Sequence, residues 1–214
     1  MPLPTSVASE RNKQIIATTA AAFFAPRPRV LEIASGYGAH GEHICQTVPG
    51  VAWTPSDRDA DALNVLAARA KTTPGLLPPL PLDVCRPPER LPTADIVFCA
   101  NMIHIAPWAA TAGLFEVAAR VLSGADPPRA GVMLTYGPYR FDGAFTSQSN
   151  AEFDGWLKER DPSFGIRDIE ALDELAKRHG AGRETVFDMP ANNHLVVWRF
   201  PATSSATSHS IGDR

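Results

Sequence analysis

A glycine-rich turn directly follows a short apolar run near the start of the chain. The stretch RVLEIASGYGAHG places Glu32 inside the apolar run and the pattern G-x-G-x-x-G at residues 36–41. Where such a turn joins a strand to a helix, it lets a ligand approach the backbone closely at the helix N-terminus. These residues therefore predict the binding of a nucleotide-like ligand, with a carboxylate at the mouth of the loop.

The carboxylate of Glu32 discriminates between two classes of ligand. A dinucleotide would place its pyrophosphate at this turn. Like charges roughly 5 Å apart repel by about 3 kcal/mol at an effective dielectric of about 20. S-adenosylmethionine carries no phosphate, and Glu32 can attract its ammonium and sulfonium, directly or through water, while Gly36 and Gly38 admit its amino-acid backbone. We therefore expect S-adenosylmethionine rather than NAD.

Polar residues follow each of the next three apolar runs. Asp57 ends VAWTPSD, Asp83 follows PPLPL, and Asn101 follows ADIVFCA. In an open α/β sheet the ligand lies beyond the carboxyl ends of the strands. Asp57 suits a ribose diol, or alternatively caps the next helix. Asp83 suits the adenine amino group, or satisfies the amides of a turn. Asn101 can offer its amide and backbone oxygens to the methionine ammonium.

The segment ANMIHIAPW, after the fourth apolar run, is predicted to lie nearest the reacting group. His104 is a candidate general base, with an ordinary pKa near 6.5, or it orders the loop before Pro107. Tyr136, after the fifth run, either contacts a sulfonium or ends a half-buried strand. Met102 and Trp108 are expected to pack in the interior, with Trp108 as an alternative wall of a substrate pocket.

Two further segments are predicted to close over the ligand. Arg11 and Asn12, in SERNK near the N-terminus, are candidates for contact with the methionine carboxylate. Asn150, Asp154 and Arg160 lie in a long polar stretch before the last helix, and insertions of this length are often lids. The alternative for these three residues is the solvated face of a helix.

The elements that must position these residues alternate between strand and helix. Short apolar runs are separated by amphipathic stretches, which is typical of a doubly wound parallel sheet with buried strands. We predict an N-terminal helix over about 8–24, with Ser9 as N-cap, and a last helix ended by Gly180. The turn PANN is so short that the final two strands, ETVFDM and HLVVWRF, must be antiparallel.

Bulk properties exclude several classes of function. A chain of 214 residues predicts one domain over 1–200 and a flexible tail over 201–214, and a net charge of -3 disfavours nucleic acid and anionic membranes. Three unpaired cysteines, expected to be reduced and mostly buried, and the absence of a signal or membrane-spanning segment predict a soluble cytoplasmic protein. The scattered histidines predict no metal site, and no G-x-S-x-G nucleophile motif is present.

The stretch LEIASGYG resembles motif I of the class I S-adenosylmethionine-dependent methyltransferases, E/D-x-G-x-G-x-G. Glu32, Gly36 and Gly38 match it, while Ala34 replaces the first glycine. Together with SERNK, PSD, LDV, FCANMIHIAPW, YGPY, SNAEFD, DPSFGIRD and MPANN, it resembles an uncharacterised methyltransferase-like family over about residues 8 to 200. The resemblance implies a Rossmann-like seven-stranded sheet, with five parallel strands, a terminal antiparallel pair and helices on both faces.

The expected activity is transfer of a methyl group from S-adenosylmethionine to a small-molecule nucleophile by in-line displacement. His104 and Tyr136 are the expected catalytic residues. Two alternatives remain open. One is a different S-adenosylmethionine reaction, such as cyclisation or cleavage, and the other is a binding module without catalysis. The acceptor and the oligomeric state are not predicted by the sequence.

Overall fold

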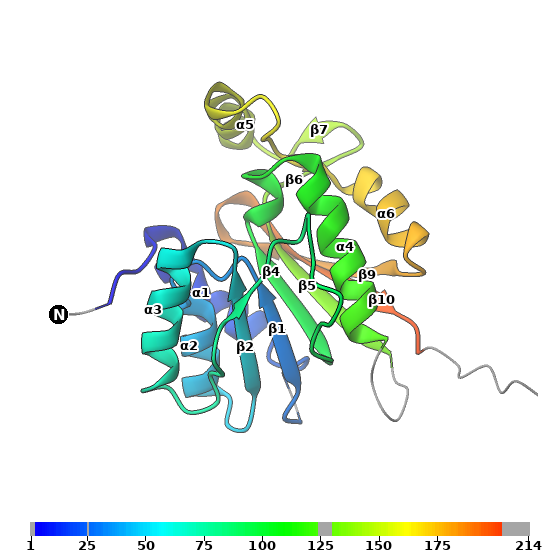
Figure 1. Cartoon of the computed structure of the whole chain (residues 1–214). Coiled ribbons are helices and arrows are strands. Elements are labelled where there is room, and N and C mark those ends of the chain that lie inside the picture. Colours follow the sequence, from blue (N-terminus) through cyan, green and yellow to red (C-terminus); the bar gives the residue numbers. More distant parts are fainter. Residues whose placement is uncertain (1–2, 25, 124–129, 203–214) are drawn as a thin grey trace, which may run out of the picture.

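A seven-stranded sheet forms the centre of the molecule in a computed structural model that describes residues 3–24, 26–123 and 130–202 (Figure 1). The strand order is β3-β2-β1-β4-β5-β10-β9. The strands are β1 (Arg29–Ile33), β2 (Ala52–Asp57), β3 (Leu80–Pro81), β4 (Ile96–Ala100), β5 (Gly131–Gly137), β9 (Gly182–Met189) and β10 (Asn193–Phe200).

The pairing of the strands follows the predicted pattern. β1 pairs in parallel with both β2 and β4, β2 pairs in parallel with β3, and β4 pairs in parallel with β5. β10 is antiparallel to β5 on one side and to β9 on the other. The strand order reverses between β1 and β4, so the carboxyl ends of these two strands flank the crevice where such sheets bind ligands.

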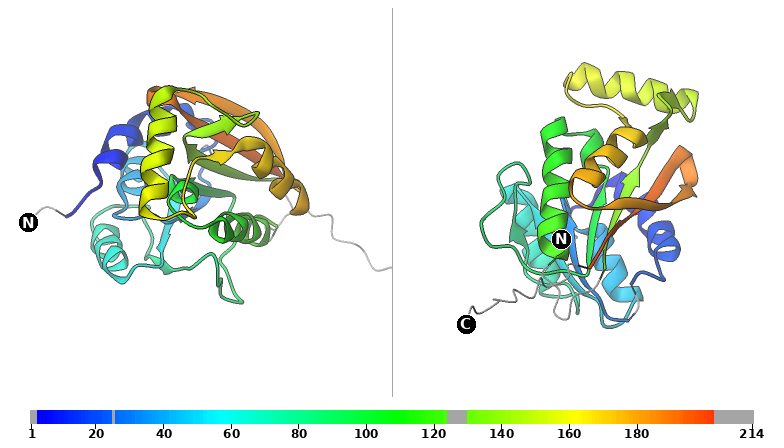
Figure 2. Two further views of the ribbon diagram at one scale, coloured as in Figure 1. Left: turned by 90° about the horizontal axis from the view of Figure 1, so that it is seen from above. Right: turned by 90° about the vertical axis from the view of Figure 1, so that its right-hand side faces the viewer.

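Helices cover both faces of the sheet. They are α1 (Val7–Thr19), α2 (Ala39–Thr47), α3 (Ala60–Ala70), α4 (Trp108–Leu122), α5 (Gln148–Arg160) and α6 (Ile169–Arg178), with short 3₁₀ turns η1 (Met102–His104) and η2 (Pro190–Asn192). α1 and α2 lie on one face of the sheet, and α4 and α6 lie on the other (Figure 2, right). Their buried side chains pack on those faces. α5 stands apart, above the carboxyl edge of the sheet (Figure 1).

Large aromatic side chains fill the core on both faces. Phe24, Trp53 and Phe98 pack against one another on the α1 and α2 side, with ring centroids 5.7–5.8 Å apart. Phe115 and Trp198 meet edge to face at 5.2 Å on the α4 and α6 side. All five side chains are buried, so the sheet is anchored on both faces and its carboxyl edge is left to hold the functional loops.

The ends of two helices test the predicted caps. Gly180 has a left-handed φ of +71° just beyond α6, and the Ala181 amide donates to the Ala176 carbonyl at 2.9 Å, which confirms the predicted C-terminal glycine. The prediction for the N-terminal helix was wrong in detail. Ser6, not Ser9, occupies the N-cap position, and α1 ends at Thr19 because the chain then turns away.

A second, three-stranded sheet is a feature that the sequence did not reveal. It has the order β7-β6-β8 and consists of β6 (Tyr139–Phe141), β7 (Ala144–Phe145) and β8 (Arg167–Asp168). β6 continues directly from β5, and α5 lies between β7 and β8 in the chain. The polar stretch expected as a loop is therefore a helix framed by short strands.

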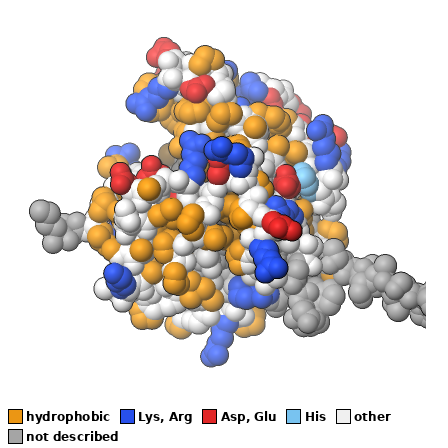
Figure 3. Space-filling view, viewed as in Figure 1, with side chains coloured by type: hydrophobic (Ala, Val, Ile, Leu, Met, Phe, Trp, Pro, Cys, Tyr) orange, Lys and Arg blue, Asp and Glu red, His pale blue; other side chains and the backbone are white. Residues whose placement is uncertain are grey.

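Three properties of the described residues complete the fold. Cys45, Cys85 and Cys99 are free thiols, but Cys85 is exposed, which corrects the expectation of mostly buried cysteines. No helix in the described ranges is long and apolar enough to cross a membrane. On the face shown in Figure 3, basic and acidic side chains are interspersed among hydrophobic ones. The tail predicted from residue 201 lies, from residue 203 onward, outside the described part of the chain.

Candidate functional site

A cavity of about 1110 Å³ opens at the carboxyl edge of the sheet. Its walls come from α1, the loop after β1, the turn after β4, the end of β5, α5 and η2. The polar residues predicted to bind or react that line it are Arg11, Asn12, Gly36, Asn101, His104, Asn150, Arg160 and Tyr136. The crevice expected from the strand order is therefore present, and it extends outward beneath α5.

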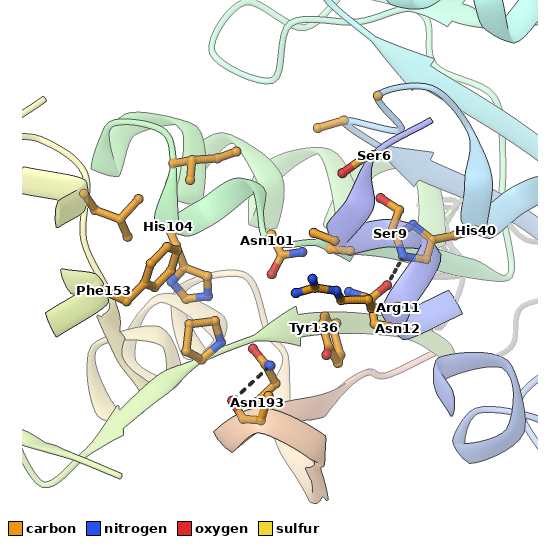
Figure 4. A pocket seen from close by; sticks show the side chains of 18 of the residues that line it. Ser6, Ser9, Arg11, Asn12, His40, Asn101, His104, Tyr136, Phe153 and Asn193 are labelled. Carbon is orange, nitrogen blue, oxygen red and sulfur yellow. Dashed lines mark hydrogen bonds between the residues drawn. The ribbon is translucent and has the colours of Figure 1, made fainter. Parts of the chain in front are cut away.

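The cavity has two ends, which Figure 4 shows side by side. Arg11, Asn12 and His40 lie at one end, beside the glycine loop, and His104 and Phe153 lie at the other. Asn101 lies between these groups, and Tyr136 lies beside Arg11 and Asn12 (Figure 4). In the text below, the glycine-loop end is the one near Gly36, and the α5 end is the one near Phe153.

Glu32 lies behind the glycine loop rather than in the cavity. Its side chain is buried, its Oε2 accepts a hydrogen bond from Trp53 Nε1 at 2.9 Å, and its Oε1 is 3.5 Å from His40 Nδ1. Both carboxylate oxygens of Glu32 therefore face protein groups, and its attraction of the cofactor, directly or through water, stays a prediction. The influence of Glu32 on the cavity passes through His40, whose Nε2 is 2.8 Å from Asn12 Oδ1.

Tyr136 is the next member of this buried polar chain. Burial raises the pKa of its hydroxyl, and a hydrogen bond from Asn12 opposes that rise. Its hydroxyl is therefore a neutral phenol at neutral pH, suited to donate or accept a hydrogen bond rather than to take up a proton. Together, Glu32, His40, Asn12 and Tyr136 form a continuous polar wall behind the glycine-loop end of the cavity.

The glycines of the loop have different roles. Gly36 has a φ of +54°, and a Cβ placed there would meet nothing within 4 Å, so this position opens onto the cavity. A Cβ on Gly38 would lie 2.6 Å from Leu66 Cδ2, and one on Gly41 would lie 2.5 Å from Trp53 Nε1. Gly38 therefore permits close packing of α2 against its neighbours, and its predicted contact with the cofactor stays a prediction.

Ala34, which replaces the first glycine of the related motif, has a backbone conformation typical of glycine. Its φ is +55°, in the left-handed region that disfavours residues with a Cβ. The neighbouring Ser35 side chain accepts a hydrogen bond from the Ser56 amide at 3.0 Å, which ties the loop to the end of β2. The loop therefore holds a strained residue in place where it borders the cavity.

Asp57 supports the glycine loop from the end of β2. Its Oδ2 accepts from the Gly36 amide at 2.9 Å, and its Oδ1 accepts from the Asp59 amide at 3.0 Å. The side chain that caps α3 is Asp59, which accepts from the Ala62 amide at 2.9 Å. The alternative that Asp57 is the helix cap is therefore wrong, while its contact with a ribose stays a prediction.

Asp83 lies outside the cavity lining and has local partners. Its Oδ1 accepts from the Cys85 amide at 2.9 Å, and its Oδ2 is 3.2 Å from the Arg86 guanidinium. The Cys85 hydrogen bond and the nearby Arg86 charge lower the pKa of this carboxyl. These contacts match the turn-satisfying alternative, and the contact with adenine stays a prediction.

Asn101 holds an unusual conformation at the end of β4. Its φ is +61°, and its amide donates to the Tyr136 carbonyl at 2.7 Å, while its own carbonyl accepts from the His104 amide at 3.1 Å. A left-handed asparagine here turns the chain sharply enough to return η1 over the end of β5. The turn therefore brings Asn101 and His104 to the same cavity.

His104 differs most from its prediction. Its ring is 1% exposed and packs edge-on against Tyr139, and neither ring nitrogen has a hydrogen-bond partner among the described residues. Burial, reinforced by the charge of Arg167, lowers its pKa to about 3. The expectation that His104 titrates near neutrality was therefore wrong. His104 is neutral at pH 7 and is too weakly basic there for efficient general-base catalysis.

Arg167 is a residue that the sequence analysis missed. Its Nε donates to the Ile103 carbonyl at 2.8 Å, and one terminal nitrogen donates to the carbonyls of Ala106 and Ser163 at 2.6 and 2.9 Å. This arginine therefore joins the turn after β4 to the segment after α5. The only sequence signal was an arginine in DPSFGIRD, which is indistinguishable from a surface residue.

The three predicted lid residues differ in burial and in whether they line the cavity. Asn150 is buried, and its amide nitrogen donates to Thr146 Oγ1 at 2.9 Å and to the Asn192 carbonyl at 3.0 Å, which ties α5 to η2. Asp154 is buried below α5, where it accepts from the Ile166 amide at 2.7 Å and does not line the cavity. Arg160 is exposed and reaches the cavity.

Met102 and Trp108 have different outcomes. Met102 is buried, as expected. The expectation that Trp108 packs in the interior was wrong, because its side chain is 42% exposed, with the Arg167 guanidinium 5.8 Å from its ring centre. Trp108 is also absent from the described lining of the cavity. Within the described ranges, no group of three histidine, cysteine or acidic side chains is arranged to hold a metal ion.

Comparison with known proteins identifies one matching family and many solved structures of similar fold. A family model described as "Protein of unknown function (DUF938)" matches residues 3–200. Solved structures of similar fold include the mitomycin 7-O-methyltransferase MmcR (TM-score 0.72, 16% identity, covering 89% of this chain and 54% of that one). CalO1, a methyltransferase in calicheamicin biosynthesis in its SAH-bound form, has a TM-score of 0.71 and 18% identity over 92% of this chain and 54% of that one.

A third similar structure is an O-methyltransferase family 2 protein from Planctomyces limnophilus in complex with apigenin. It has a TM-score of 0.69 and 18% identity, covering 89% of this chain and 60% of that one. The chain therefore spans between 54 and 60% of the length of these three solved chains. At these identities the likeness concerns the fold, and it confirms the Rossmann-like class I methyltransferase fold.

Proposed function

We propose that this chain, which belongs to the DUF938 family of proteins of unknown function, binds S-adenosylmethionine and transfers its methyl group to a small-molecule nucleophile. The observation that carries the proposal is the cavity at the carboxyl ends of β1 and β4, lined by Gly36, Asn101 and Tyr136. Its position is the one at which sheets of this kind bind their ligands.

The glycine-loop end fits the cofactor in shape and chemistry. Gly36 leaves space that a Cβ would fill, which lets a ligand backbone approach the loop. Arg11 has no ion pair among the described residues and suits the methionine carboxylate, while Asn101 offers amide and carbonyl oxygens to the ammonium. Asp57, whose carboxylate accepts a hydrogen bond from the Gly36 amide, suits the ribose.

The printed descriptions of the similar structures support the same ligand. CalO1 was solved with SAH, the product that S-adenosylmethionine becomes when it loses its methyl group. MmcR is an O-methyltransferase of mitomycin, and the Planctomyces limnophilus protein was solved with apigenin. These three proteins act on or contain small molecules, which supports a small-molecule acceptor for this chain.

The bound cofactor would supply a methyl carbon on a sulfonium, and the acceptor lone pair would bond to that carbon while the carbon–sulfur electron pair stays on sulfur. The protein aligns the acceptor and excludes water beneath α5. The described lining contains no aspartate or glutamate, and His104 is too weak a base near pH 7. We therefore propose that an acceptor must arrive unprotonated at its nucleophilic atom.

The lack of a proton acceptor also favours a second candidate function, a binding module without catalysis. The two functions differ in their product. Incubation with S-adenosylmethionine and a metabolite extract yields S-adenosylhomocysteine if the chain is a methyltransferase, methylthioadenosine if it cleaves the cofactor, and neither if it only binds.

Calorimetry tests cofactor binding with two matched glycine variants. Gly36→Ala and Gly180→Ala both place a Cβ at a left-handed φ, of +54° and +71°, with no atom within 4 Å, but only Gly36 borders the cavity. Both variants should lose about 1–2 kcal/mol of stability. Only Gly36→Ala should also bind S-adenosylhomocysteine about ten-fold more weakly, a difference of about 1.4 kcal/mol.

Wild-type protein should bind S-adenosylmethionine and S-adenosylhomocysteine and show no comparable affinity for NAD. Equal cofactor affinity in the two glycine variants would remove Gly36 from the site. NAD binding as tight as that of S-adenosylhomocysteine would contradict the proposed function itself.

A further inference from the structure

An exposed pair of aromatic side chains forms the α5 end of the cavity. Phe153 and Trp156 are 38% and 45% exposed, and both line the cavity. Their rings are stacked, with centroids 5.6 Å apart and planes 23° apart. Figure 4 shows Phe153 on the same side as His104 and across the cavity from Arg11 and His40. This apolar surface is therefore separate from the glycine-loop end.

The size of the cavity leaves this end for a second ligand. Pockets that hold one drug-sized molecule occupy about 300–1,000 Å³. The volume here is about 1110 Å³, and it runs from the glycine loop to α5. A cofactor at the glycine loop therefore leaves the aromatic pair free to contact another molecule.

Arg160 adds a positive charge to the aromatic surface. Its guanidinium carbon lies 3.7 Å from the centre of the Trp156 ring, which fixes the planar group against that face. In the described part of the chain, Arg160 has no hydrogen bond or ion pair. Its N–H donors, which lie in the guanidinium plane, are consequently available to a carboxylate in a paired geometry.

The charges around the cavity favour an anion. The described lining residues include Arg11 and Arg160 but no aspartate or glutamate. The buried carboxylates outside the lining are engaged: Glu32 by Trp53 and His40, and Asp154 of α5 by the Ile166 amide and Lys158. A cationic acceptor at the α5 end would therefore meet the positive charge of Arg160 and no unpaired negative charge, whereas an anionic acceptor would find an unpaired guanidinium.

We infer that the methyl acceptor is a planar aromatic molecule that carries a carboxylate or similar anionic oxygen group. Its ring packs on Phe153 and Trp156, and its anion pairs with Arg160. This inference rests on the proposed function, since the glycine-loop end is assigned there to the cofactor. It makes Arg160 a residue that determines specificity at the acceptor site.

Three probes of the same shape and different charge test the inference. 2-Naphthoate, 2-naphthalenemethanol and 2-naphthylmethylammonium are titrated into the wild-type protein, with and without saturating S-adenosylhomocysteine, and binding is followed by calorimetry. Naphthoate should bind about ten-fold more tightly than the alcohol, because it adds a charge-assisted pair, and the ammonium should bind most weakly.

Two variants and one control assign the effect to residues. Arg160→Met should weaken naphthoate binding by about ten-fold and leave the alcohol nearly unchanged. Trp156→Leu should weaken both. Arg178→Met removes an exposed arginine from the last turn of another helix, α6, and should change neither. Affinity for S-adenosylhomocysteine should be unchanged in all three, which reports that the glycine-loop end is intact.

The outcomes separate this inference from the proposed function. If S-adenosylhomocysteine binds but the ammonium probe binds best, or Arg160→Met leaves naphthoate affinity unchanged, the acceptor class is wrong and the cofactor site stands. If S-adenosylhomocysteine does not bind, the proposed function fails, and the titrations without it still decide whether α5 forms an anionic aromatic site. Absence of binding by all three probes, in both conditions, overturns the inference.

Discussion

At the scale of the residue, the site is governed by how each polar group is paired. Glu32 has two protein partners, Asn12 bridges His40 and Tyr136, and His104 has none among the described residues. His104 is neutral because the loss of hydration of its charged form, together with the charge of Arg167, outweighs the opposing effects of the Gly165 backbone and the Asp154 charge. His104 therefore contributes shape and an apolar ring edge at neutral pH.

The burial of neutral His104 should make the protein less stable in acid. Its pKa is about 3 in the folded protein and about 6.5 in the unfolded chain, so the unfolded state binds the extra proton. Its contribution is complete above pH 6.5 and is lost as the pH falls from about 6.5 toward 3. The free energy of unfolding should fall by about 2 kcal/mol between pH 6.5 and 5, at about 1.4 kcal/mol per unit.

Urea unfolding at several pH values measures this effect. In His104→Gln the free energy of unfolding should depend less on pH over the same range, whatever its absolute value, because the titrating group is gone. The same slope in both proteins would show that His104 is not buried in its neutral form. Once a substrate is known, the pH profile of turnover near neutrality should be the same in wild type and in His104→Gln.

At the scale of the element, Arg167 joins two segments that carry the α5 end of the cavity. Its guanidinium donates to carbonyls of the turn after β4 and of the segment after α5. Arg167→Met should destabilise the protein by roughly 1.5–3 kcal/mol, since it leaves carbonyls at a partly buried position without their charged donor. It should also loosen the backbone around η1.

Hydrogen exchange measured by peptide digestion checks this prediction. Exchange over residues 101–108 should be faster in Arg167→Met than in wild type, while the sheet amides of β1 and β4 remain protected. Arg178→Met, at the exposed end of α6, is the control and should leave the exchange of 101–108 as it is in wild type. Unchanged exchange over 101–108 in Arg167→Met would show that this arginine does not hold the turn.

The same elements show what the sequence reveals. The alternation of apolar runs and amphipathic stretches predicted the strand and helix order because helices such as α2 and α4 have a clear buried face. The strands β7 and β8 have two residues each, which is too short for any periodic pattern. α5 was missed as an ordered wall because two of its three buried residues, Asn150 and Asp154, are polar.

The residues of the site also divide into those that the sequence could predict and those that it could not. Asn12, Gly36, Asn101 and Tyr136 could be predicted to line one cavity, because each lies at the end of an apolar run or in a recognisable motif, and topology brings such positions together. The side-chain direction of Glu32 depends on Trp53, a partner 21 positions away. Such contacts are set by packing, and local sequence carries no signal for them.

At the scale of the whole molecule, the cavity is assembled from segments spread across most of the chain. Its lining runs from Ser6 in the N-cap of α1 to Asn193 at the start of β10. A ligand that fills it therefore contacts elements that are far apart in the sequence, from α1 to the start of β10. Unfolding of any large part of the domain must release such a ligand.

Ligand binding should consequently raise the melting temperature of the protein as a whole. At a free concentration of S-adenosylhomocysteine 100 times its Kd, binding stabilises the folded state by about 2.7 kcal/mol. For a domain of this size each kcal/mol raises Tm by about 2–4 °C, so a single transition should move upward by about 5–10 °C. NAD at the same concentration should leave Tm nearly unchanged, and Gly36→Ala should show a smaller shift than Gly180→Ala at one fixed ligand concentration. A shift confined to one of two separate transitions would instead show that the cavity belongs to a part of the chain that unfolds independently, and that the elements lining it do not act as one cooperative unit.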